Sequence, residues 1–414
     1  MLALILPFSK DMTERLRTKS KNRIVLILGT LIALGPFSID MYLPGFESVA
    51  SEFDVDISRV GLTLTSYFIG ISLGQLAYGP LMDRYGRRKP LIVGLSIFIV
   101  SCLLCAFSWN LYTLIVSRFF LALGGCAGMV ASKAIVRDLF EKSQVADVLS
   151  TLMLIMGVAP IIAPTVGGIV VAAFNWQAVF FILAAFAVIM LFNVTYILPE
   201  SAEPNHRTSL HPKAIIKEYI SILRNREFFL FATARGFSLG ALLAYVSSAP
   251  FMFSAYFGLN EQQFGWVFGG NAFGLILGSQ INRLMLRHFS LFNITLSTSI
   301  MLAVLTMGGL TAAFLAPTFW VIYPILFFML FFIGFQNPNV TALALDPFSV
   351  QAGSASALIG SMSMFFGSVF SVLVSSFVTE SIVPLFYILA ACAICSLALI
   401  LIYRKKEQLV SEHA

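Results

Sequence analysis

The sequence predicts an all-α membrane protein with twelve transmembrane helices arranged in two six-helix halves. Of its 414 residues, 58% are hydrophobic and only 11% are charged, whereas soluble domains carry about 25% charged residues. The apolar residues gather in runs long enough to span a bilayer. Only helices and closed barrels pair every backbone group within lipid. Barrel strands are short and alternate in polarity, which these runs do not, so the runs are helices.

Twelve apolar runs, separated by polar loops, define the expected helices. They cover residues 24–46, 60–82, 91–109, 111–132, 148–171, 177–198, 228–256, 264–283, 291–315, 319–341, 354–377 and 382–403. The longest polar segment is the link at 199–227, which separates an N-terminal half at 24–198 from a C-terminal half at 228–403. An N-terminal tail at 1–23 and a C-terminal tail at 404–414, both expected in the cytoplasm, flank the two halves.

A short internal repeat supports this division. The second run ends at residues 79–84 with G-P-L-M-D-R, and the second run of the other half ends at residues 278–283 with G-S-Q-I-N-R. Both segments fit the pattern G-x-x-x-(D/N)-R. Internal repeats at matching positions of two halves are typical of transporters.

The basic residues predict the orientation. With the N-terminus in the cytoplasm, almost all of them lie in inner loops and tails, whereas the outer loops hold only Arg59 beside acidic residues such as Glu47 and Asp56. By the positive-inside rule, we expect both termini in the cytoplasm. The same distribution accounts for the net charge of +6, so we expect no nucleic-acid partner.

The loop after the second run carries the most specific motif. It combines two glycines, one aspartate and a basic cluster, namely Gly79, Asp83, Arg84, Gly86, Arg87 and Arg88. A basic cytoplasmic loop explains the arginines but not Gly79, Asp83 and Gly86 at this spacing. The glycines permit a tight turn and a close helix approach. Asp83 is suited to accept hydrogen bonds from a helix N-terminus or an arginine.

Two charged residues lie inside apolar runs. Arg118 is about seven residues, or about 10 Å, from the outer end of its run, and Asp40 is about 9 Å deep in the first run. Charged residues inside a membrane are functional by default. Burial favours the protonated carboxyl group, whereas a nearby arginine favours the charged one. Asp40 and Arg118 are therefore our candidates for proton coupling, and a fixed ion pair that joins two helices is the structural alternative.

The run at 148–171 contains residues that bend helices or permit close packing: Gly157, Pro160, Pro164, Gly167 and Gly168. Proline removes a helix hydrogen bond, and glycine lets helices approach one another. A kinked packing helix is the structural alternative to a functional motif.

Several uncharged polar side chains also lie within the runs. We take as candidates for lining a cavity Tyr42, Tyr67, Gln75, Tyr245, Asn271, Gln336 and Asn337. The amides either bond one helix to another or line the cavity, and the tyrosines either stack on a substrate or lie at the membrane interface. Arg235 fits a side chain that snorkels toward the inner face.

Three of these motifs resemble those of the major facilitator superfamily. The loop 79–89 is similar to its loop signature, and Arg118 with Gly124 to its R-x-x-x-x-x-G motif. The segment 157–168 resembles the drug/proton antiporter motif, with Ala163 where a glycine is usual. The resemblance covers essentially the whole chain and is greatest to the twelve-span Bcr/CflA-type drug-resistance subfamily.

This resemblance implies alternating access between two halves, with the loop cluster locking them in one state. It also implies proton-driven efflux of compounds such as bicyclomycin, phenicols or sulfonamides across the inner membrane of a bacterium. A single deep acid favours neutral or weakly polar substrates. The alternatives are export of an endogenous metabolite or siderophore, and proton-coupled import in the same fold.

Motifs for enzymatic chemistry are missing from the sequence. It has no Walker loop for ATP and no His, Cys and carboxylate group with metal-ligand spacing. We therefore expect no enzyme activity, cofactor or metal. The expected partners are a small-molecule substrate, protons and the lipid bilayer, and the expected form is a monomer.

Overall fold

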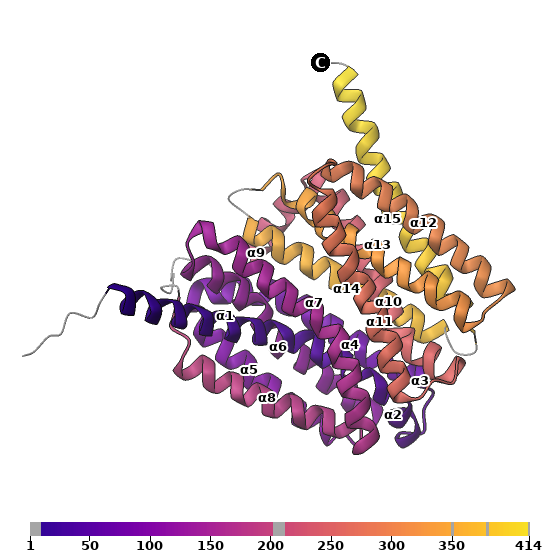
Figure 1. Cartoon of the computed structure of the whole chain (residues 1–414), viewed down its shortest axis with the longest axis horizontal. Helices are drawn as coiled ribbons and strands as arrows, with labels where there is room; N and C mark the ends of the chain where they lie inside the picture. Colours follow the sequence, from indigo (N-terminus) through magenta and orange to yellow (C-terminus); the bar gives the residue numbers. More distant parts are fainter. Residues whose placement is uncertain (1–9, 202–211, 349–351, 378–380, 413–414) are drawn as a thin grey trace, which may run out of the picture.

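The structure is a computed structural model that describes residues 10–201, 212–348, 352–377 and 381–412. These residues form two groups of six long helices (Figure 1). The N-terminal half consists of α1 (Lys10–Asp40), α4 (Leu62–Tyr85), α5 (Arg88–Ala106), α6 (Leu111–Leu139), α7 (Lys142–Ala173) and α8 (Trp176–Tyr196). The C-terminal half consists of α10 (Arg226–Pro250), α11 (Glu261–Met285), α12 (Leu291–Leu315), α13 (Phe319–Leu345), α14 (Ala352–Phe377) and α15 (Val383–Glu412). The predicted fold class is confirmed.

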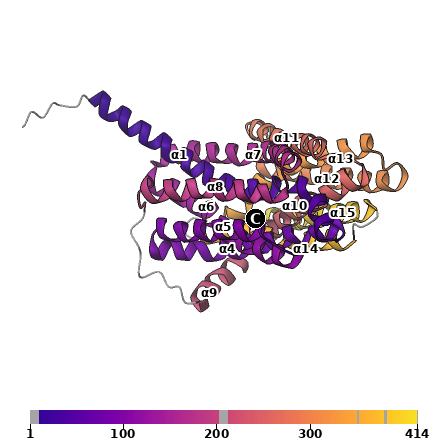
Figure 2. The same cartoon turned by 90° about the horizontal axis from the view of Figure 1, so that it is seen from below.

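Shorter helices occupy the connections. Between α1 and α4 lie η1 (Leu43–Gly45), α2 (Phe46–Glu52) and α3 (Ile57–Val60), and η2 (Phe251–Tyr256) extends α10. Within the link, α9 (Pro212–Leu223) packs against α10 and α14. Figure 2 shows α9 beside the bundle, on the side of α4 and α14.

Composition and length agree with a membrane location. Eleven helices of the described chain are long and apolar enough to cross a bilayer. The twelfth long helix, α11, is not among them although it has 25 residues. The glycines and amide side chains of α11 lower its mean hydropathy. They belong to a helix that packs against α7 of the other half.

The observed helices follow the predicted runs and extend beyond several of them. The largest differences are at the tails, because α1 already begins at Lys10 and α15 continues to Glu412. Residues 1–9 and 413–414 of the predicted tails lie outside the described residues. The predicted run at 24–46 is also divided, because α1 ends at Asp40 and a short helical turn follows.

The bundle has two ends. We call the end where α1 begins and α15 ends the terminal face, and the end that carries η1, α2 and α3 the opposite face. The two halves meet toward the opposite face and diverge toward the terminal face (Figure 1). They contact each other mainly through α4 with α14 and through α7 with α11.

Candidate functional site

A cavity of about 510 Å³ lies between the halves at their terminal-face end. Its walls come from the last turns of α4 and α6, the first turns of α14, and α9. Gln75 of α4 is part of the wall, as are Gly79, Asp83 and Arg87 of the loop motif. Tyr219 of α9 completes the wall. Residues of the loop motif thus line the cavity.

Link helix α9 connects the two halves beside this cavity. The Tyr219 hydroxyl donates to the carbonyl oxygen of Leu76 in α4 at 3.3 Å. Burial, together with the nearby Glu218 and Asp83 carboxylates, raises the pKa of Tyr219 to about 12. The hydroxyl therefore remains a hydrogen-bond donor at all physiological pH values.

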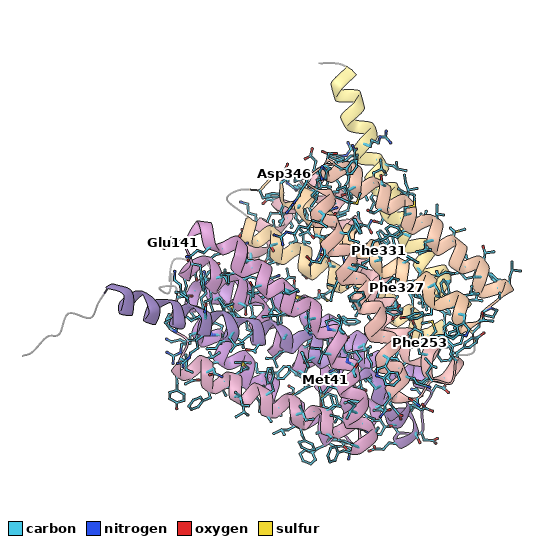
Figure 3. The ribbon with its side chains drawn as sticks, viewed as in Figure 1. Met41, Glu141, Phe253, Phe327, Phe331 and Asp346 are labelled. Carbon is cyan, nitrogen blue, oxygen red and sulfur yellow. The ribbon has the colours of Figure 1, made fainter. Side chains whose placement is uncertain are left out.

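On the opposite face the halves are joined by hydroxyl hydrogen bonds. The Thr65 hydroxyl of α4 donates to Ser371 of α14 at 2.8 Å, and Ser72 donates to the carbonyl oxygen of Ser361 at 2.9 Å. In Figure 3, Met41 and Phe253 lie where the halves meet, whereas Glu141 and Asp346 lie at the diverging ends. The protein is therefore open between its halves on the terminal face and closed on the opposite face.

The glycines of α7 form the second contact between the halves. A Cβ atom on Gly168 would lie 2.7 Å from the Glu261 carbonyl oxygen of α11, and one on Gly167 would collide with the Met41 carbonyl oxygen. A Cβ atom on Gly265 of α11 would lie 3.1 Å from the Pro164 carbonyl oxygen of α7. Because only glycine permits this backbone approach, Gly168 serves the contact between halves, whereas Gly167 lets α7 pack against the chain at the end of α1 within the N-terminal half.

The remaining members of this motif have less specific surroundings. Pro160 and Pro164 lie inside α7, which continues through both of them. A Cβ atom on Gly157 would make ordinary contact with Ile276, at 3.4 Å. Gly157 is therefore not needed for a close approach in this state.

Arg118 lies in an aromatic enclosure within the N-terminal half. It is completely buried, and its guanidinium carbon lies 4.5 Å from the ring centre of Tyr67 and 4.9 Å from that of Tyr42. Its Nη1 donates to the Ser38 carbonyl oxygen at 2.7 Å, while Nε and Nη2 have no hydrogen-bond partner. Tyr42 and Tyr67, predicted to line a cavity, instead contact this arginine.

Asp40 is buried at the end of α1, at 5% exposure, and lies close to the contact between halves. Although both residues belong to the described chain, no ion pair joins Asp40 to Arg118. Asp40 is the last residue of α1, and the turn η1 that follows it packs against α10 and α11 of the other half. Both residues are thus linked to the end of α1, Asp40 as its last residue and Arg118 through its hydrogen bond to Ser38. Their side chains nevertheless have different surroundings.

Tyr245 and Asn271 form a polar group next to Asp40. The Asn271 amide donates to the Tyr245 hydroxyl at 2.8 Å, and the Tyr245 ring stacks on Phe268 at 5.7 Å. The Asn271 side-chain oxygen is buried and has no hydrogen-bond partner. Two predicted cavity residues are therefore brought together, in a buried position that connects α10 and α11.

The other two amides have different surroundings. Gln336 donates to the hydroxyls of Ser299 and Ser396 at 2.9 and 3.0 Å. Of the two roles left open for Gln336, the structure shows bonding between helices, because α12 and α15 enclose it. Asn337 has a buried side-chain oxygen without a partner.

A network of charges holds the loop between α4 and α5. Arg87 donates to Asp83 at 2.5 Å and to Asp138 of α6 at 2.8 Å. Burial lowers the pKa of Arg87, but the hydrogen bonds to Asp138 and Asp83 outweigh burial and raise the pKa overall. The backbone N–H groups of Arg87 and Arg88 donate to the Glu200 carboxylate. Carboxylates from three separate segments thus hold the loop through hydrogen bonds.

The two loop glycines differ in their roles. Gly86 has φ +82°, a conformation that glycine adopts without strain. A Cβ atom on Gly79 would meet nothing within 4 Å, so the close helix approach predicted for Gly79 is wrong in this state. Arg84 lies over the ring of Tyr85, at 5.9 Å from its centre.

Sequence analysis missed Asp138 and Glu200 as partners of the loop, and it misplaced Lys133. It assigned Lys133 to an inner loop, but α6 continues to Leu139 and Lys133 lines the cavity. Arg235 does not snorkel as predicted, because its Nη1 donates to Ser363 of α14 at 2.5 Å. A helix that continues past its apolar run is the signal that would have placed Lys133 correctly.

Comparison with known proteins agrees with this architecture. The model of the Major Facilitator Superfamily matches residues 26–372. The chain is 31% identical to a bicyclomycin resistance protein homolog of Haemophilus influenzae, over 91% of this chain and 95% of that protein. It is 34% identical to the MFS-type transporter YdgK of Bacillus subtilis, over 86% and 89% of the two chains. With the multidrug resistance protein MdtL of Klebsiella pneumoniae it shares 27% identity, over 92% and 95%.

Solved structures show the same fold. A D-xylose-proton symporter superposes with a TM-score of 0.74 at 13% identity, covering 91% of this chain and 96% of that one. A bacterial homolog of the lysosomal transporter Spinster, in an inward-facing conformation, gives 0.68 at 14% identity, over 92% and 94%.

Proposed function

Because the chain belongs to the major facilitator superfamily, we propose that it exports small, mostly apolar organic compounds across the inner membrane of a bacterium in exchange for protons. Relatives named for bicyclomycin and multidrug resistance favour this direction and this class of substrate. The observation that carries the proposal is Asp40, a buried carboxyl group without a cation partner where the halves meet.

The orientation follows from the basic residues. Arg84, Arg87, Arg88 and Lys89 all lie at the terminal face, where α1 begins and α15 ends. The positive-inside rule places this face in the cytoplasm. In this orientation the cavity between the halves opens to the cytoplasm, where an exporter collects its substrate. We therefore propose that this is the inward-facing state of a protein that works as a monomer.

Alternating access requires the two contacts between halves to separate while the terminal face closes. The contacts of α4 with α14 and of α7 with α11 include hydroxyl hydrogen bonds and glycine-to-backbone approaches. These interactions can break without changes inside either half. On the terminal face, the loop held by Asp83, Arg87 and Asp138 is the part that must rearrange when the halves approach.

Asp40 supplies the coupling. A buried carboxylate without a partner is costly in a membrane, and binding a proton removes this cost. In the outward-facing state the contact beside Tyr245 is open, and Asp40 takes a proton from outside. After the return to the inward-facing state, substrate entering from the cytoplasm displaces the proton. Arg118 is fixed within one half, and its role is to hold the end of α1 through Ser38.

The test is substrate-induced proton release in inside-out vesicles, with phenicols, bicyclomycin and sulfonamides as substrates. Wild type is expected to move protons when a transported compound is added, and Asp40→Asn is expected not to. The matched control is Asp54→Asn, an exposed aspartate with φ 52°, a backbone conformation that asparagine also adopts. Coupling that survives in Asp40→Asn would show that the proton binds elsewhere. A folded wild type that moves no protons with any compound would contradict drug export of these classes.

A further inference from the structure

Link helix α9 has an exposed side that the proposed transport cycle does not use. Ile216 and Ile220 lie one turn apart on this side, and their exposed fractions are 54% and 45%. On the other side of the helix, Ile215 and Tyr219 line the cavity, and Ile222 is completely buried in a cluster with residues of α10 and α14. The apolar surface of α9 is therefore wider than the part that the bundle covers.

Basic side chains border these two isoleucines. Lys213, Lys217 and Arg224 are all exposed, and the backbone N–H of Arg224 continues the helical hydrogen bonding of α9. At about 100° per residue, helix geometry places all three beside the exposed isoleucines and away from the buried side. Within the described part of the chain, no carboxylate forms an ion pair with any of the three. The acidic residue of α9, Glu218, lines the cavity on the other side. The exposed side thus combines an apolar strip with three cations that no carboxylate neutralises.

The position of α9 along the bundle corresponds to the edge of the membrane. Tyr219 bonds to the carbonyl oxygen of Leu76, which lies about 13 Å before the end of α4 at 1.5 Å per residue. Farther from that end, Leu73 of α4 and Phe365 of α14 are exposed, as lipid-facing side chains are. Figure 2 shows α9 outside the bundle, beside these two helices. In the proposed orientation, the apolar strip of α9 lies where the lipid-facing surface meets the cytoplasmic headgroups.

We propose that α9 lies on the cytoplasmic leaflet and binds the phosphate groups of anionic lipids through Lys213, Lys217 and Arg224, with Ile216 and Ile220 at the boundary of headgroups and acyl chains. The inference uses the proposed orientation and goes beyond transport. Helices with an apolar strip bordered by basic residues bind membrane interfaces, and anionic lipids strengthen this binding. A second copy of the chain fits less well, because a symmetric contact through this side would place three cations against three cations. Since the other side of α9 lines the cavity, this helix separates the cavity from the lipid.

The test measures how deeply a spin label on Ile220→Cys lies in the membrane. Cys395→Ser removes the exposed cysteine, and the other four cysteines are buried. The full-length protein is placed in nanodiscs of phosphatidylcholine alone, or of equal parts of phosphatidylcholine and phosphatidylglycerol. Molecular oxygen concentrates in lipid and a nickel chelate stays in water, so the access of each to the label gives its depth. In the anionic nanodiscs, the label is expected to be open to oxygen and protected from the chelate. High salt is expected to reduce this protection, because salt screens the attraction. A label on Ser221→Cys, an exposed polar position of the same helix, is expected to remain open to the chelate.

Removal of the charges tests the headgroup contact. The triple variant Lys213→Gln, Lys217→Gln, Arg224→Gln is expected to abolish most of the difference between the two lipid mixtures. Each cation near an anionic surface shifts the binding equilibrium about fivefold, and three together shift it about a hundredfold. The matched control replaces three exposed cations of the terminal face outside α9 and is expected to leave the depth unchanged. It consists of Arg283→Gln, Arg287→Gln and Arg404→Gln.

Three results would overturn the proposal. A label that is open to the chelate in both kinds of nanodisc shows that α9 lies in water. A label that is protected from both oxygen and the chelate shows that protein covers the strip, either a second copy or another part of the chain. Equal depth in the two lipid mixtures, or equal effects of the two triple variants, shows that anionic headgroups are not recognised. If the substitutions unfold the protein, the salt dependence of the parent decides. No result depends on transport, so the proposed export stands or fails separately.

Discussion

Substitution of Gly168 tests whether the contact of α7 with α11 sets the conformational equilibrium. A Cβ atom at this position would lie 2.7 Å from the Glu261 carbonyl oxygen and 3.2 Å from its carbonyl carbon. Because both atoms belong to the backbone of the other half, no side-chain rotation relieves the clash. Overpacking of this kind costs about 1–3 kcal/mol. The cost falls only on the state that is closed at the opposite face, so Gly168→Ala is expected to shift the population toward the outward-facing state about 5- to 150-fold.

The shift is measured as a distance distribution between spin labels on the opposite face. Glu47→Cys and Thr318→Cys place one exposed label on each half. Cys395→Ser removes the exposed cysteine, and the other four cysteines are buried. Longer distances are expected for Gly168→Ala than for the parent protein.

Gly308→Ala provides the matched control, because a Cβ atom on Gly308 would meet nothing within 4 Å. If both alanine variants give the parent's distances, the reasoning from the glycine contact is refuted. A shift in Gly308→Ala alone would show that the labels report something other than this contact.

Three further substitutions test other parts of the structure. Asp138→Asn weakens the hydrogen bond to Arg87 by about 1.5–3 kcal/mol, so trypsin is expected to cleave the loop faster, and an unchanged rate would argue against the network. Asn282→Ala removes one member of a pair in which the Asn282 and Asn339 amides donate to each other at 2.8 and 2.9 Å. It is expected to destabilise the protein by about 1–3 kcal/mol in thermal unfolding, whereas replacement of both by Leu costs less. Arg118→Lys removes the guanidinium group that lies over the rings of Tyr42 and Tyr67, so a lower melting temperature is expected, and an unaltered one would show that the aromatic enclosure contributes nothing.

The helices were predictable because lipid imposes a simple requirement on sequence. A span needs about 20 apolar residues, so α12 was predicted with its observed bounds, 291–315. This requirement does not predict where a helix ends once it has left the membrane. A helix that leaves the membrane needs no apolar residues, so the extensions of α6 to Leu139 and of α15 to Glu412 were not visible as runs.

The site was less predictable because depth along a helix says nothing about the direction of a side chain. Asp40 and Arg118 were expected to meet because their depths agree, yet Arg118 turns into the N-terminal half and Asp40 lies near the other half. Lys133 lies directly after its apolar run, and its place on the cavity wall required the structure. The positions of the α7 glycines were predicted, but the contact of Gly168 with the backbone of α11 required the structure.

The hydroxyl bonds between α4 and α14 have a consequence for the speed of transport. Each is a weak link: hydrogen bonds between membrane helices contribute about 0.6 kcal/mol on average, and a serine or threonine hydroxyl exchanges its partner for water at little cost. The links at Thr65 and Ser72 can therefore break one after another, from the outer edge inward. A contact between helices whose hydrogen bonds break one at a time has no single high free-energy barrier to opening. We therefore expect the two halves to close the opposite face without a high barrier to their separation.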